Sequence, residues 1–462
     1  MNYREINDLF FNMEVKNDFF SLNIDGIYFW KLIRVHVYND VIGAVLSNGK
    51  LHPNASTYSI SEIIKSKLII YYAKIFHKTK PLKKDTKVLV FKHRRRINVN
   101  GDFVEVNTDY LDLTGYVDKN TTWCVDTDIA FGNRNIDKNG RNFLLPSPHM
   151  ILFYRLWNKI FIHEKKELVS NINNLINSTF GISIDIHGYL ERELAGYKAH
   201  YYMVSKYLRN ANIKEIIVVC SYGKEGIIQA ARDMGIMTSE IQHGVINRYH
   251  LGYSFPIELS KNKVKYFPDN ILLYGDFWIN VANYPVKSKE NLITVGSPYF
   301  DLQYRKYSVI RKEPNSVLFV SAGPTGKKMS EVAHIIAREL PDTHIYYKLH
   351  PSEFSVWKEI YPDLKKGMID NLEVVEDGIN IFELYAKCNA LVGVKSTTIY
   401  ESFAFISNVI LYNLPGVEEM QTVIDHYSIP VARDTKELIA LLQDYPLEVH
   451  IDSDQFYKII NR

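Results

Sequence analysis

The second half of the chain alternates short apolar strands with amphipathic helices, and this alternation restricts the fold more than any other feature. Runs rich in β-branched and aromatic residues, among them SVLFVSA, HIYYKLH, ALVGV and NVILYNL, are separated by helical segments such as KKMSEVAHIIAREL. Strands that are connected through helices pair in parallel, and the helices then cover both faces of the sheet. The pattern predicts a doubly wound α/β domain.

The first half carries a second set of such elements. The strands EIIVVCS (215–221) and IMTSEIQ (236–242) flank the helical segment KEGIIQAARDMG, and KVLVFKH (87–93) is expected to open this sheet. Residues 94–150 are polar and turn-rich, so we expect loops there, with TTWCVD as a strand. The sequence therefore predicts two parallel-sheet domains.

The boundary between the two domains is expected in a polar stretch that contains proline, residues 253–269. We divide the chain into a domain over 1–260 and a domain over 261–462. The first includes a helical and basic N-terminal region, 1–85, in which NIDGIYFWKLIRVHVYNDVIGAVL predicts one amphipathic helix.

Composition excludes several classes of protein. The chain has 462 residues and 46% hydrophobic content, enough for more than one buried core. Lys and Arg total 55 against 52 Asp and Glu, so the whole chain lacks the positive field of a dedicated nucleic-acid binder. The chain has three cysteines, Cys124, Cys220 and Cys388. They are too far apart in the sequence to form a CxxC zinc or redox motif.

A cluster of seven lysines between Lys65 and Lys84 surrounds the apolar run 68–76. This pattern is typical of a helix lying on an anionic membrane surface, and equally of a solvated basic face on a packed helix. Nine residues are too few to span a bilayer, and the N-terminus carries acids where a signal peptide has a basic head. We expect a cytoplasmic protein, either free or associated with the inner face of the membrane.

In parallel α/β sheets ligands bind at the carboxyl ends of the strands, which makes the residues after each strand the candidates for function. The loop that begins at Ser321 and contains Gly323 is small and glycine-rich, so its backbone N–H groups can approach a phosphate, with Lys327 or Lys328 nearby. It lacks the Walker A spacing, and a simple Gly-Pro turn explains it as well.

Two further strand ends in the second half carry phosphate-binding chemistry. His350, made rigid by Pro351, follows the strand that ends in Lys348 and can donate a ring N–H to a phosphate oxygen. The strand ALVGV leads into a helix whose first turn holds Ser396, Thr397 and Thr398. Hydroxyl and N–H groups at the start of a helix can bind an anion, and Ser396 can equally be an ordinary N-cap of the helix. One turn later, Glu401 is either a ribose ligand or a surface charge.

The first half offers candidates of its own. Gly244 permits a sharp turn after Gln242 and His243, which would present both side chains at the sheet edge for acid–base work or phosphate contact, unless His243 is structural. Three arginines, Arg94, Arg95 and Arg96, directly follow the first strand. They could bind a carboxylate or phosphate of the acceptor through two hydrogen bonds each, and a solvated basic turn explains them equally well.

The segments IQHG, YKLHP and VKSTTIYES, in this order on an α/β pattern, resemble the bacterial GT-B glycosyltransferases that build surface polysaccharides. The group includes capsule Kdo-transferases and, more distantly, bacterial sialyltransferases and CDP-glycerol polymerases of teichoic acids. The segments WKLIR and HRRR…NGDFVEVNTDYL are also similar to N-terminal pieces of capsule and O-antigen enzymes. The resemblance covers roughly residues 85–440.

The resemblance implies a GT-B fold, in which two Rossmann-like domains face each other across a cleft. The first domain would bind the acceptor, a hydroxyl of a surface polysaccharide or lipid-linked glycan, and the second a nucleotide-activated sugar. His350 and the Ser396–Thr397 pair would hold the donor phosphate, without a metal or another cofactor. The HP and Ser/Thr motifs are those of CMP-sugar enzymes, so the resemblance favours CMP as the nucleotide, with UDP and CDP as alternatives.

One departure from the family concerns the acidic triplet that precedes HP in the sialyltransferases. The match here, Glu376-Asp377-Gly378, lies after HP, so the catalytic role is not transferred to it. It either ends a strand or contacts the nucleobase or ribose. With it, the expected donor-binding residues are Ser321, Gly323, Lys348, His350, Pro351, Glu376, Asp377, Ser396, Thr397, Thr398 and Glu401.

An acceptor hydroxyl needs a general base, which the first domain should supply. The candidates are Asp102, Glu105 and Asp109 in the loop after the first strand, with Glu225 and His243 as competitors, and we favour Asp109. Around the base, the expected acceptor-binding residues are Arg94, Arg95, Arg96, Gln242 and Glu225.

Three other functions remain open from the sequence. Asp126-Thr-Asp128 formally matches the metal-binding Asp-x-Asp of a different transferase class. The two-domain architecture also suits a non-hydrolysing sugar-nucleotide epimerase, and a carbohydrate-binding protein without enzymatic activity. Only an epimerase would convert its sugar nucleotide to an isomer without an acceptor.

Overall fold

The chain forms two compact units. The first domain comprises Met1–His243, Arg248–Leu273 and Ala282–Val295, and the second domain comprises Gly244–Asn247, Tyr274–Val281 and Gly296–Arg462. The computed structural model describes residues 1–46, 81–93, 96–99, 102–126, 144, 148–321, 323–366, 369–376, 378–444 and 451–460.

The first domain is built on a parallel sheet, which has six strands in the described part of the chain. Their order is β4 (Thr122–Asp126), β1 (Val88–Lys92), β5 (Glu215–Val219), β6 (Met237–Ile241), β7 (Asn270–Leu273) and β8 (Leu292–Thr294). The chain first places β4 beside β1 and then continues on the other side of β1 with β5. At such a reversal, parallel sheets bind ligands beyond the carboxyl ends of the two strands.

The core of this domain lies around the central strands. Ile216, Ile217 and Val218 of β5 are fully buried, as are Leu89 and Phe91 of β1. Burial on both faces explains why these strands read as continuous apolar runs without alternation.

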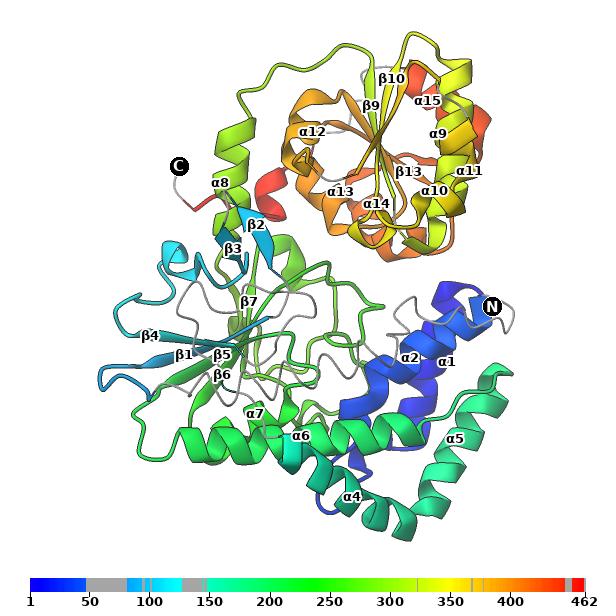
Figure 1. Ribbon diagram of the computed structural model, residues 1–462. Coiled ribbons are helices and arrows are strands. Elements are labelled where there is room, and N and C mark those ends of the chain that lie inside the picture. Colours follow the sequence, from blue (N-terminus) through cyan, green and yellow to red (C-terminus); the bar gives the residue numbers. More distant parts are fainter. Residues whose placement is uncertain are drawn as a thin grey trace. The chain divides into compact units, whose positions relative to one another are not determined.

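Helices cover the sheet of the first domain. They are α1 (Tyr3–Lys16), α2 (Trp30–Leu46), α4 (Pro148–Glu164), α5 (Lys166–Phe180), α6 (His187–Tyr207) and α7 (Glu225–Asp233). Figure 1 shows α6 between α7 and α4, and both contacts are extensive. The approach of α7 to α6 requires Gly226, because a Cβ there would lie 2.2 Å from the carbonyl oxygen of Tyr197.

A buried ion pair fastens the two N-terminal helices together. Arg34 of α2 donates from Nε and Nη2 to the carboxylate of Glu14 of α1, at 2.8 and 2.9 Å. Its Nη1 also donates to the carbonyl oxygens of Leu251 (2.5 Å) and Ser254 (3.1 Å). Each polar atom of this buried pair thus has a partner, as burial of a charge demands.

The second domain holds another parallel sheet, again of six strands among the described residues. The order is β11 (Leu372–Val375), β10 (His344–Lys348), β9 (Ser316–Val320), β12 (Ala390–Gly393), β13 (Asn408–Tyr412) and β14 (Val431–Ala432). Numbered from β9 this order is 3-2-1-4-5-6, that of the Rossmann fold, and its reversal lies between β9 and β12.

Helices flank both faces of the second sheet. Figure 1 shows α9 and α15 on one side and α12 on the other. The helices are α8 (Pro298–Tyr307), α9 (Gly326–Glu339), α10 (Trp357–Ile360), α11 (Pro362–Lys366), α12 (Ile381–Lys387), α13 (Thr397–Ser402), α14 (Gln421–Tyr427) and α15 (Thr435–Gln443).

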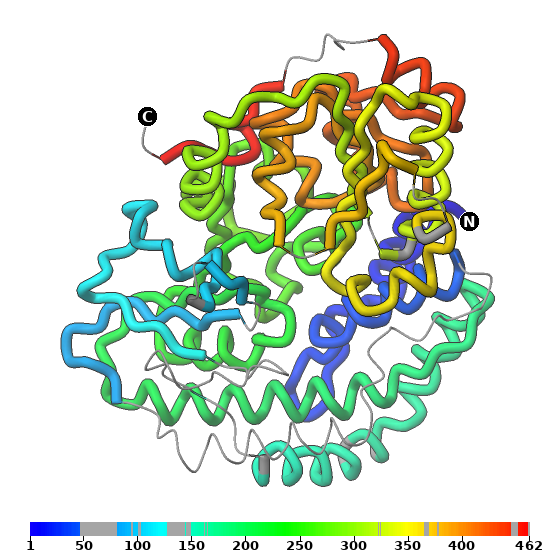
Figure 2. The backbone as a smooth tube through the Cα atoms, turned by 45° about the horizontal axis from the view of Figure 1, so that its top comes forward, coloured from blue at the N-terminus to red at the C-terminus, as the bar shows by residue number. Residues whose placement is uncertain are grey.

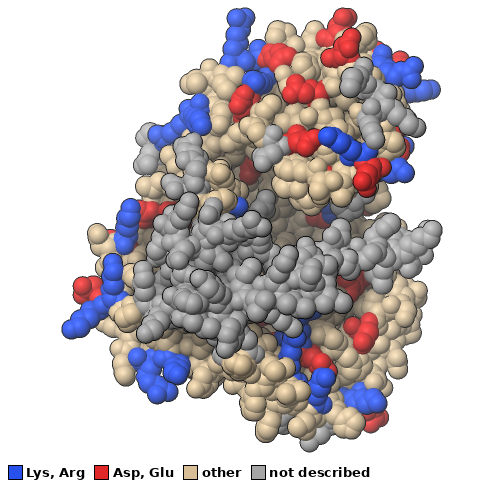
Figure 3. Space-filling view, viewed as in Figure 1, with Lys and Arg blue, Asp and Glu red and all other residues tan. Residues whose placement is uncertain are grey.

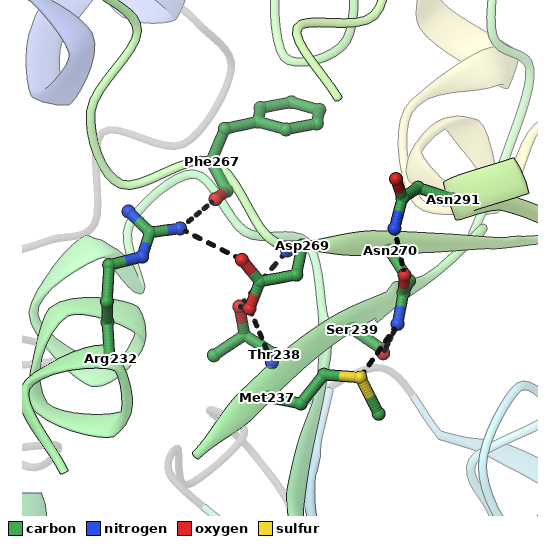
Figure 4. Close-up of polar contacts among 8 residues, drawn as sticks. All are labelled: Arg232, Met237, Thr238, Ser239, Phe267, Asp269, Asn270 and Asn291. Atoms are coloured by element: carbon green, nitrogen blue, oxygen red, sulfur yellow. Dashed lines mark hydrogen bonds and ion pairs between the residues drawn. The ribbon is translucent and has the colours of Figure 1, made fainter. Parts of the chain in front are cut away.

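At its amino edge, the first sheet is held by a polar network (Figure 4). Asp269, just before β7, accepts from the backbone N–H (2.9 Å) and the hydroxyl (2.8 Å) of Thr238 at the start of β6, and it pairs with Arg232. Next to it, Asn291 donates to Asn270 at 2.7 Å. These polar groups satisfy one another, so this edge is structural.

The two sheets confirm the predicted fold class, α/β with two Rossmann-like doubly wound parallel-sheet domains, which is the domain content of a GT-B enzyme. The predicted boundary at 260/261 is too early. Both β7 and β8 pair into the first sheet, and Ala282–Val295 belongs to the first domain. Each is a short apolar strand, and nothing in such a run indicates which sheet it joins.

The N-terminal region differs from the prediction in its number of helices. One helix was expected within residues 1–60, and the described residues there form two, α1 and α2. α4 also begins at Pro148, inside the segment predicted as loops. Asn2 caps α1 through a capping box with Glu5, a spacing that would have indicated the start of this helix.

Two surface properties of the described residues bear on function. Basic and acidic side chains are interspersed on the face shown in Figure 3. Among these residues, no helix has both the length and the hydropathy to cross a membrane.

Candidate functional site

The loops predicted to bind a donor meet at one edge of the second sheet. β10, β9 and β12 are neighbours, so the residues that follow them, His350, Ser321 and Ser396, project from the same carboxyl edge. β10 and β12 lie two strand spacings apart, about 10 Å. The edge includes the reversal between β9 and β12, where a Rossmann sheet binds its ligand.

A buried glutamate that the sequence analysis did not single out joins two of these loops. Glu353 is 4% exposed. One of its carboxylate oxygens, Oε1, accepts from the hydroxyls of Ser321 (2.8 Å) and Tyr361 (2.6 Å). The other, Oε2, accepts from the backbone N–H of His350 at 2.8 Å. The loops after β9 and β10 are therefore fixed to each other, which preorganises the edge for a ligand.

The hydrogen bonds of His350 determine which ring nitrogen carries the proton. The backbone N–H of Ser352 donates to Nδ1 at 3.3 Å, and the hydroxyl of Ser352 lies 2.7 Å from the same atom. A backbone N–H can only donate, so Nδ1 is the acceptor and the neutral ring carries its proton on Nε2. The exposed imidazole thus has the donor form that a phosphate oxygen requires.

The loop after β9 is tightly packed. A Cβ at Gly326 would lie 2.0 Å from the hydroxyl of Tyr361 and 2.7 Å from that of Ser321, so only glycine fits. Gly323 begins a 3-10 turn, Gly323–Thr325, that leads into α9. At the start of α9 the hydroxyl of Thr325 is buried without a hydrogen-bond partner. A turn and a phosphate loop are thus both compatible with this segment.

The Ser/Thr segment after β12 forms a short helix, α13. Ser396 caps α13, and its hydroxyl accepts from the backbone N–H of Thr398 at 3.1 Å. α13 has only six residues, so its dipole adds little to anion binding. The methyl group of Thr397 lies 3.9 Å from where a Cβ of Gly244 would be, which places the end of the QHG motif beside this turn within the second domain.

The other predicted donor residues make contacts of their own. Lys348 donates to the backbone oxygen of Glu376, whose side chain accepts from the indole of Trp357 at 2.9 Å. Glu401 accepts from the hydroxyl of Tyr385 at 3.0 Å. Asp377 lies outside the described residues, and a nucleobase or ribose role for this group stays a prediction.

In the first domain, the carboxylates after β1 are held by strong partners. Asp109 forms an ion pair with Lys92, and its second oxygen accepts from the backbone N–H of Glu105 at 2.8 Å. Glu105 is 1% exposed and binds Asn107 and Thr108. A carboxylate beside an ammonium group is a weak base, so this geometry does not favour Asp109 over the other candidates.

The arginines after β1 are only partly described. Arg96 forms an ion pair with Asp126 at the end of β4, and Arg94 and Arg95 lie outside the described residues. Both side chains of this pair are nearly buried, which fits a structural role for Arg96. Within the part of the chain that the structure describes, no group of three or more His, Cys, Asp or Glu could hold a metal ion.

His243 lies between two tyrosines at the carboxyl end of β6. The hydroxyl of Tyr253 is 3.0 Å from Nδ1, and that of Tyr222 is 3.0 Å from Nε2. Tyr253 in turn donates to the carboxylate of Glu240 at 2.6 Å. Glu240 is fully buried, and this burial raises its pKa. Sequence reasoning found His243 but neither the two tyrosines nor Glu240, whose sequence positions do not reveal their contact.

The hydrogen-bond directions in this chain are mutually consistent. When Glu240 is ionised, Tyr253 donates to it and accepts from Nδ1–H of His243, which leaves Nε2 to accept from Tyr222. A proton gained at Glu240 reverses every bond. Beyond Tyr222 lies Cys220, whose backbone has the unusual φ of 60° at the end of β5. The chain thus connects an imidazole to a buried carboxylate.

The two remaining acceptor candidates are buried. Gln242 is 0% exposed, and its backbone N–H donates to Leu272 at 2.9 Å. Glu225 lies 3.4 Å from Lys31, and burial raises the pKa of Glu225 to about 7. The amide of Gln242 and the carboxylate of Glu225 are both buried. Contact between these residues and an acceptor stays a prediction, and their burial does not favour it.

Comparison with known proteins gives similarity at the level of three-dimensional structure. No family model matches the chain, and no curated protein matches it in sequence. The UDP-GlcNAc 2-epimerase from Methanocaldococcus jannaschii is similar with a TM-score of 0.48 and 11% identity, over 81% of this chain and 96% of that one. The UDP-GlcNAc 2-epimerase from Neisseria meningitidis has a TM-score of 0.46 and 12% identity, over 81% and 96%.

MurG from Acinetobacter baumannii is also similar, with a TM-score of 0.44 and 11% identity, over 78% of this chain and 90% of that one. At these scores the similarities do not assign a function to the chain, which has to be argued from its own residues.

Proposed function

We propose that the protein is a glycosyltransferase of the GT-B class, which moves a sugar from a nucleotide donor to a hydroxyl of a bacterial surface glycan. The observation that carries this proposal is the carboxyl edge of the second sheet, where Glu353 fixes Ser321 after β9 to His350 after β10, beside the Rossmann reversal between β9 and β12. A nucleotide phosphate is the ligand that such an edge suits, because Nε2–H of His350 and the hydroxyls of Ser396 and Thr397 can donate to an anion at the carboxyl ends of these strands.

In the proposed donor complex, Nε2–H of His350 donates to a phosphate oxygen. The loop after β9 supplies backbone N–H groups, and the Ser396–Thr397 turn supplies hydroxyl donors. As the bond to the sugar breaks, negative charge develops on the phosphate, and these fixed donors stabilise it without rearranging. The resemblance to capsule enzymes favours a CMP-activated sugar, and a UDP or CDP donor fits the same groups.

We further propose His243 as the general base for the acceptor hydroxyl. Its two ring nitrogens are oriented by tyrosines, and a buried carboxylate stands behind Tyr253 to stabilise the imidazolium that forms. To accept the proton, His243 has to exchange the neutral hydroxyl of Tyr222 at Nε2 for the acceptor, whereas Asp109, which the sequence favoured, would have to leave the ammonium group of Lys92. It remains the competing base, and the two are distinguished by their separate substitution to Ala.

The donor site is tested by nucleotide binding. Calorimetry and thermal shift with CMP, CDP, UDP and GDP should show that one of them binds and stabilises the protein. His350→Ala should weaken that nucleotide at least about tenfold, since a hydrogen bond to a charged group is lost. His344→Ala is the matched control, because His344 lies at the opposite end of the same strand. Binding that is equal in the two variants, or absent for all four nucleotides, would refute the donor site.

An epimerase is the second candidate, favoured by the connection of His243 to Glu240. Such a pair could remove a proton from a sugar carbon as well as from a hydroxyl. Incubating the protein with UDP-GlcNAc in deuterated water, without an acceptor, separates the two. An epimerase yields a deuterated isomer, and a glycosyltransferase leaves the sugar undeuterated.

A further inference from the structure

Among the described residues, helix α4 packs one face against α6 and carries large exposed apolar side chains on another face. The side chains of Asn158 and Ile162 are buried, and Asn158 donates to the backbone oxygen of Glu191 on α6 at 3.4 Å. Figures 1 and 2 both show α4 alongside α6. The residues on the other face are large, apolar and exposed by 43–58%; they are Leu152, Phe153, Leu156, Trp157 and Ile160.

These five side chains form one continuous stripe. Leu152, Leu156 and Ile160 follow one another at four-residue intervals, and Phe153 and Trp157 form the adjacent row. The rings of Phe153 and Trp157 are stacked with centroids 5.9 Å apart. A contiguous group of five large apolar side chains, each about half exposed, is the kind of patch that marks an interaction site.

The charges beside the stripe indicate the kind of partner. Arg155 and Lys159 are exposed, and at four-residue spacing they line one edge of it. Lys165 and Lys166 follow directly after the helix. Glu164 is the one acid in the sequence 148–166, against these four bases. A helix face of Leu, Phe and Trp with flanking Arg and Lys suits an anionic lipid surface, where apolar side chains enter the acyl region and cations contact headgroups.

We propose that α4 docks the first domain on an anionic lipid bilayer, with the helix parallel to the membrane plane. This membrane face is distinct from the basic stretch Lys65–Lys84 that the sequence suggested for membrane contact. Of that stretch, the structure describes only residues 81–84. The proposal does not depend on the proposed function, because it uses no residue of the candidate site.

The test is co-sedimentation of the full chain with vesicles of phosphatidylcholine alone and of phosphatidylcholine mixed with phosphatidylglycerol. The wild type should bind the mixed vesicles, and salt should weaken binding by screening the cations. The double variant F153S/I160S should lower the bound fraction at least about tenfold, since each apolar side chain contributes to transfer. R155E/K159E should lose binding to the anionic vesicles in particular.

The control is I257S/V309S, which removes two apolar side chains that are 85% and 83% exposed but lie outside α4. It should bind as the wild type does, and circular dichroism should show that all variants are folded. Wild-type protein that stays in the supernatant with both vesicles overturns the proposal, as does F153S/I160S binding like the control. A third result would also overturn the proposal. If the wild type were a dimer in ultracentrifugation and F153S/I160S were a monomer, α4 would bind a second copy of the chain and not a membrane.

Discussion

At the residue scale, His243 illustrates how the tautomer of a neutral histidine depends on its neighbours. Tyr222 and Tyr253 hold its two nitrogens at 3.0 Å each, and the carboxylate of Glu240 sets the direction of the hydrogen bonds. Burial raises the pKa of Tyr253 well above its ordinary value, so this tyrosine relays a hydrogen bond without ionising itself. Glu240 does not contact His243, yet through Tyr253 it determines which ring nitrogen of His243 carries the proton and which can act as a base.

We expect Tyr253→Phe to lower kcat by roughly 10- to 100-fold, within the range of general acid–base effects, and to leave KM nearly unchanged. Without the hydroxyl, Nδ1 loses its acceptor and the imidazole populates both tautomers. The pH dependence of kcat checks the activity, and ¹⁵N NMR of the His243 ring checks the tautomer without substrate.

The matched control for this substitution is Tyr116→Phe. It removes a part-buried bond of similar length, 2.8 Å from Tyr116 to Glu215, at the amino edge of the same sheet. If both variants had the same kcat and the His243 tautomer were unchanged, Tyr253 would have a structural role only.

At the scale of single elements, local patterns identified most strands, and contacts between elements explain what was missed. Short runs of β-branched residues such as those at 215–219 indicated strands correctly, because burial on both faces leaves an unbroken apolar run. α1 was missed because two of the residues it buries are polar, Asn7 and Glu14, which weakens the apolar period. The roles of Glu353 and Glu240 depend on tertiary partners that no local pattern contains.

The start of α9 offers a test of how tightly the proposed donor edge is packed. Gly326→Ala places a Cβ 2.0 Å from the hydroxyl of Tyr361, which forces the loop or Tyr361 to move. We expect a loss of about 1–3 kcal/mol in the free energy of unfolding, typical of overpacking, together with weaker nucleotide binding. Denaturant unfolding and calorimetry measure the two effects.

The control for this substitution is Gly196→Ala on α6, where nothing lies within 4 Å of the added Cβ. It should stabilise the protein by about 0.5–1 kcal/mol, since alanine is the better helix former. Gly326→Ala behaving like Gly196→Ala would show that the loop after β9 is loosely packed.

At the scale of the whole molecule, the sequence predicted two parallel-sheet domains correctly and misplaced the border between them. The run at 270–273 has the same composition as strands of either sheet, and its pairing with β6 follows from tertiary contacts. Whole-molecule stability also depends on such contacts. Lys31 of α2 and Glu225 of α7, 194 residues apart, form a buried pair.

We expect this pair to make stability depend on pH in a defined direction. Burial raises the pKa of Glu225 from 4.5 to about 7, so the folded protein binds more protons than the unfolded chain between these values. The free energy of unfolding should therefore fall as pH rises from 4.5 through 7, by about 3 kcal/mol at roughly 1.4 kcal/mol per pKa unit. Urea unfolding at several pH values measures it.

Glu225→Gln should remove this fall, because the glutamine does not titrate. Glu290→Gln, at an exposed position, should retain it. A pH dependence that Glu225→Gln leaves intact would show that the buried carboxyl does not titrate in this range.

The division of the chain between its domains has a practical consequence for anyone who wishes to separate them. The polypeptide passes from one unit to the other five times, after residues 243, 247, 273, 281 and 295. Cleavage at any one of these points leaves at least one fragment without a segment of its own domain. A chain cut after residue 295 keeps every segment of the first domain, whereas the remaining fragment, 296–462, lacks two segments of the second domain, Gly244–Asn247 and Tyr274–Val281. Truncation can therefore retain the whole first domain, but no single piece of chain holds the second domain alone.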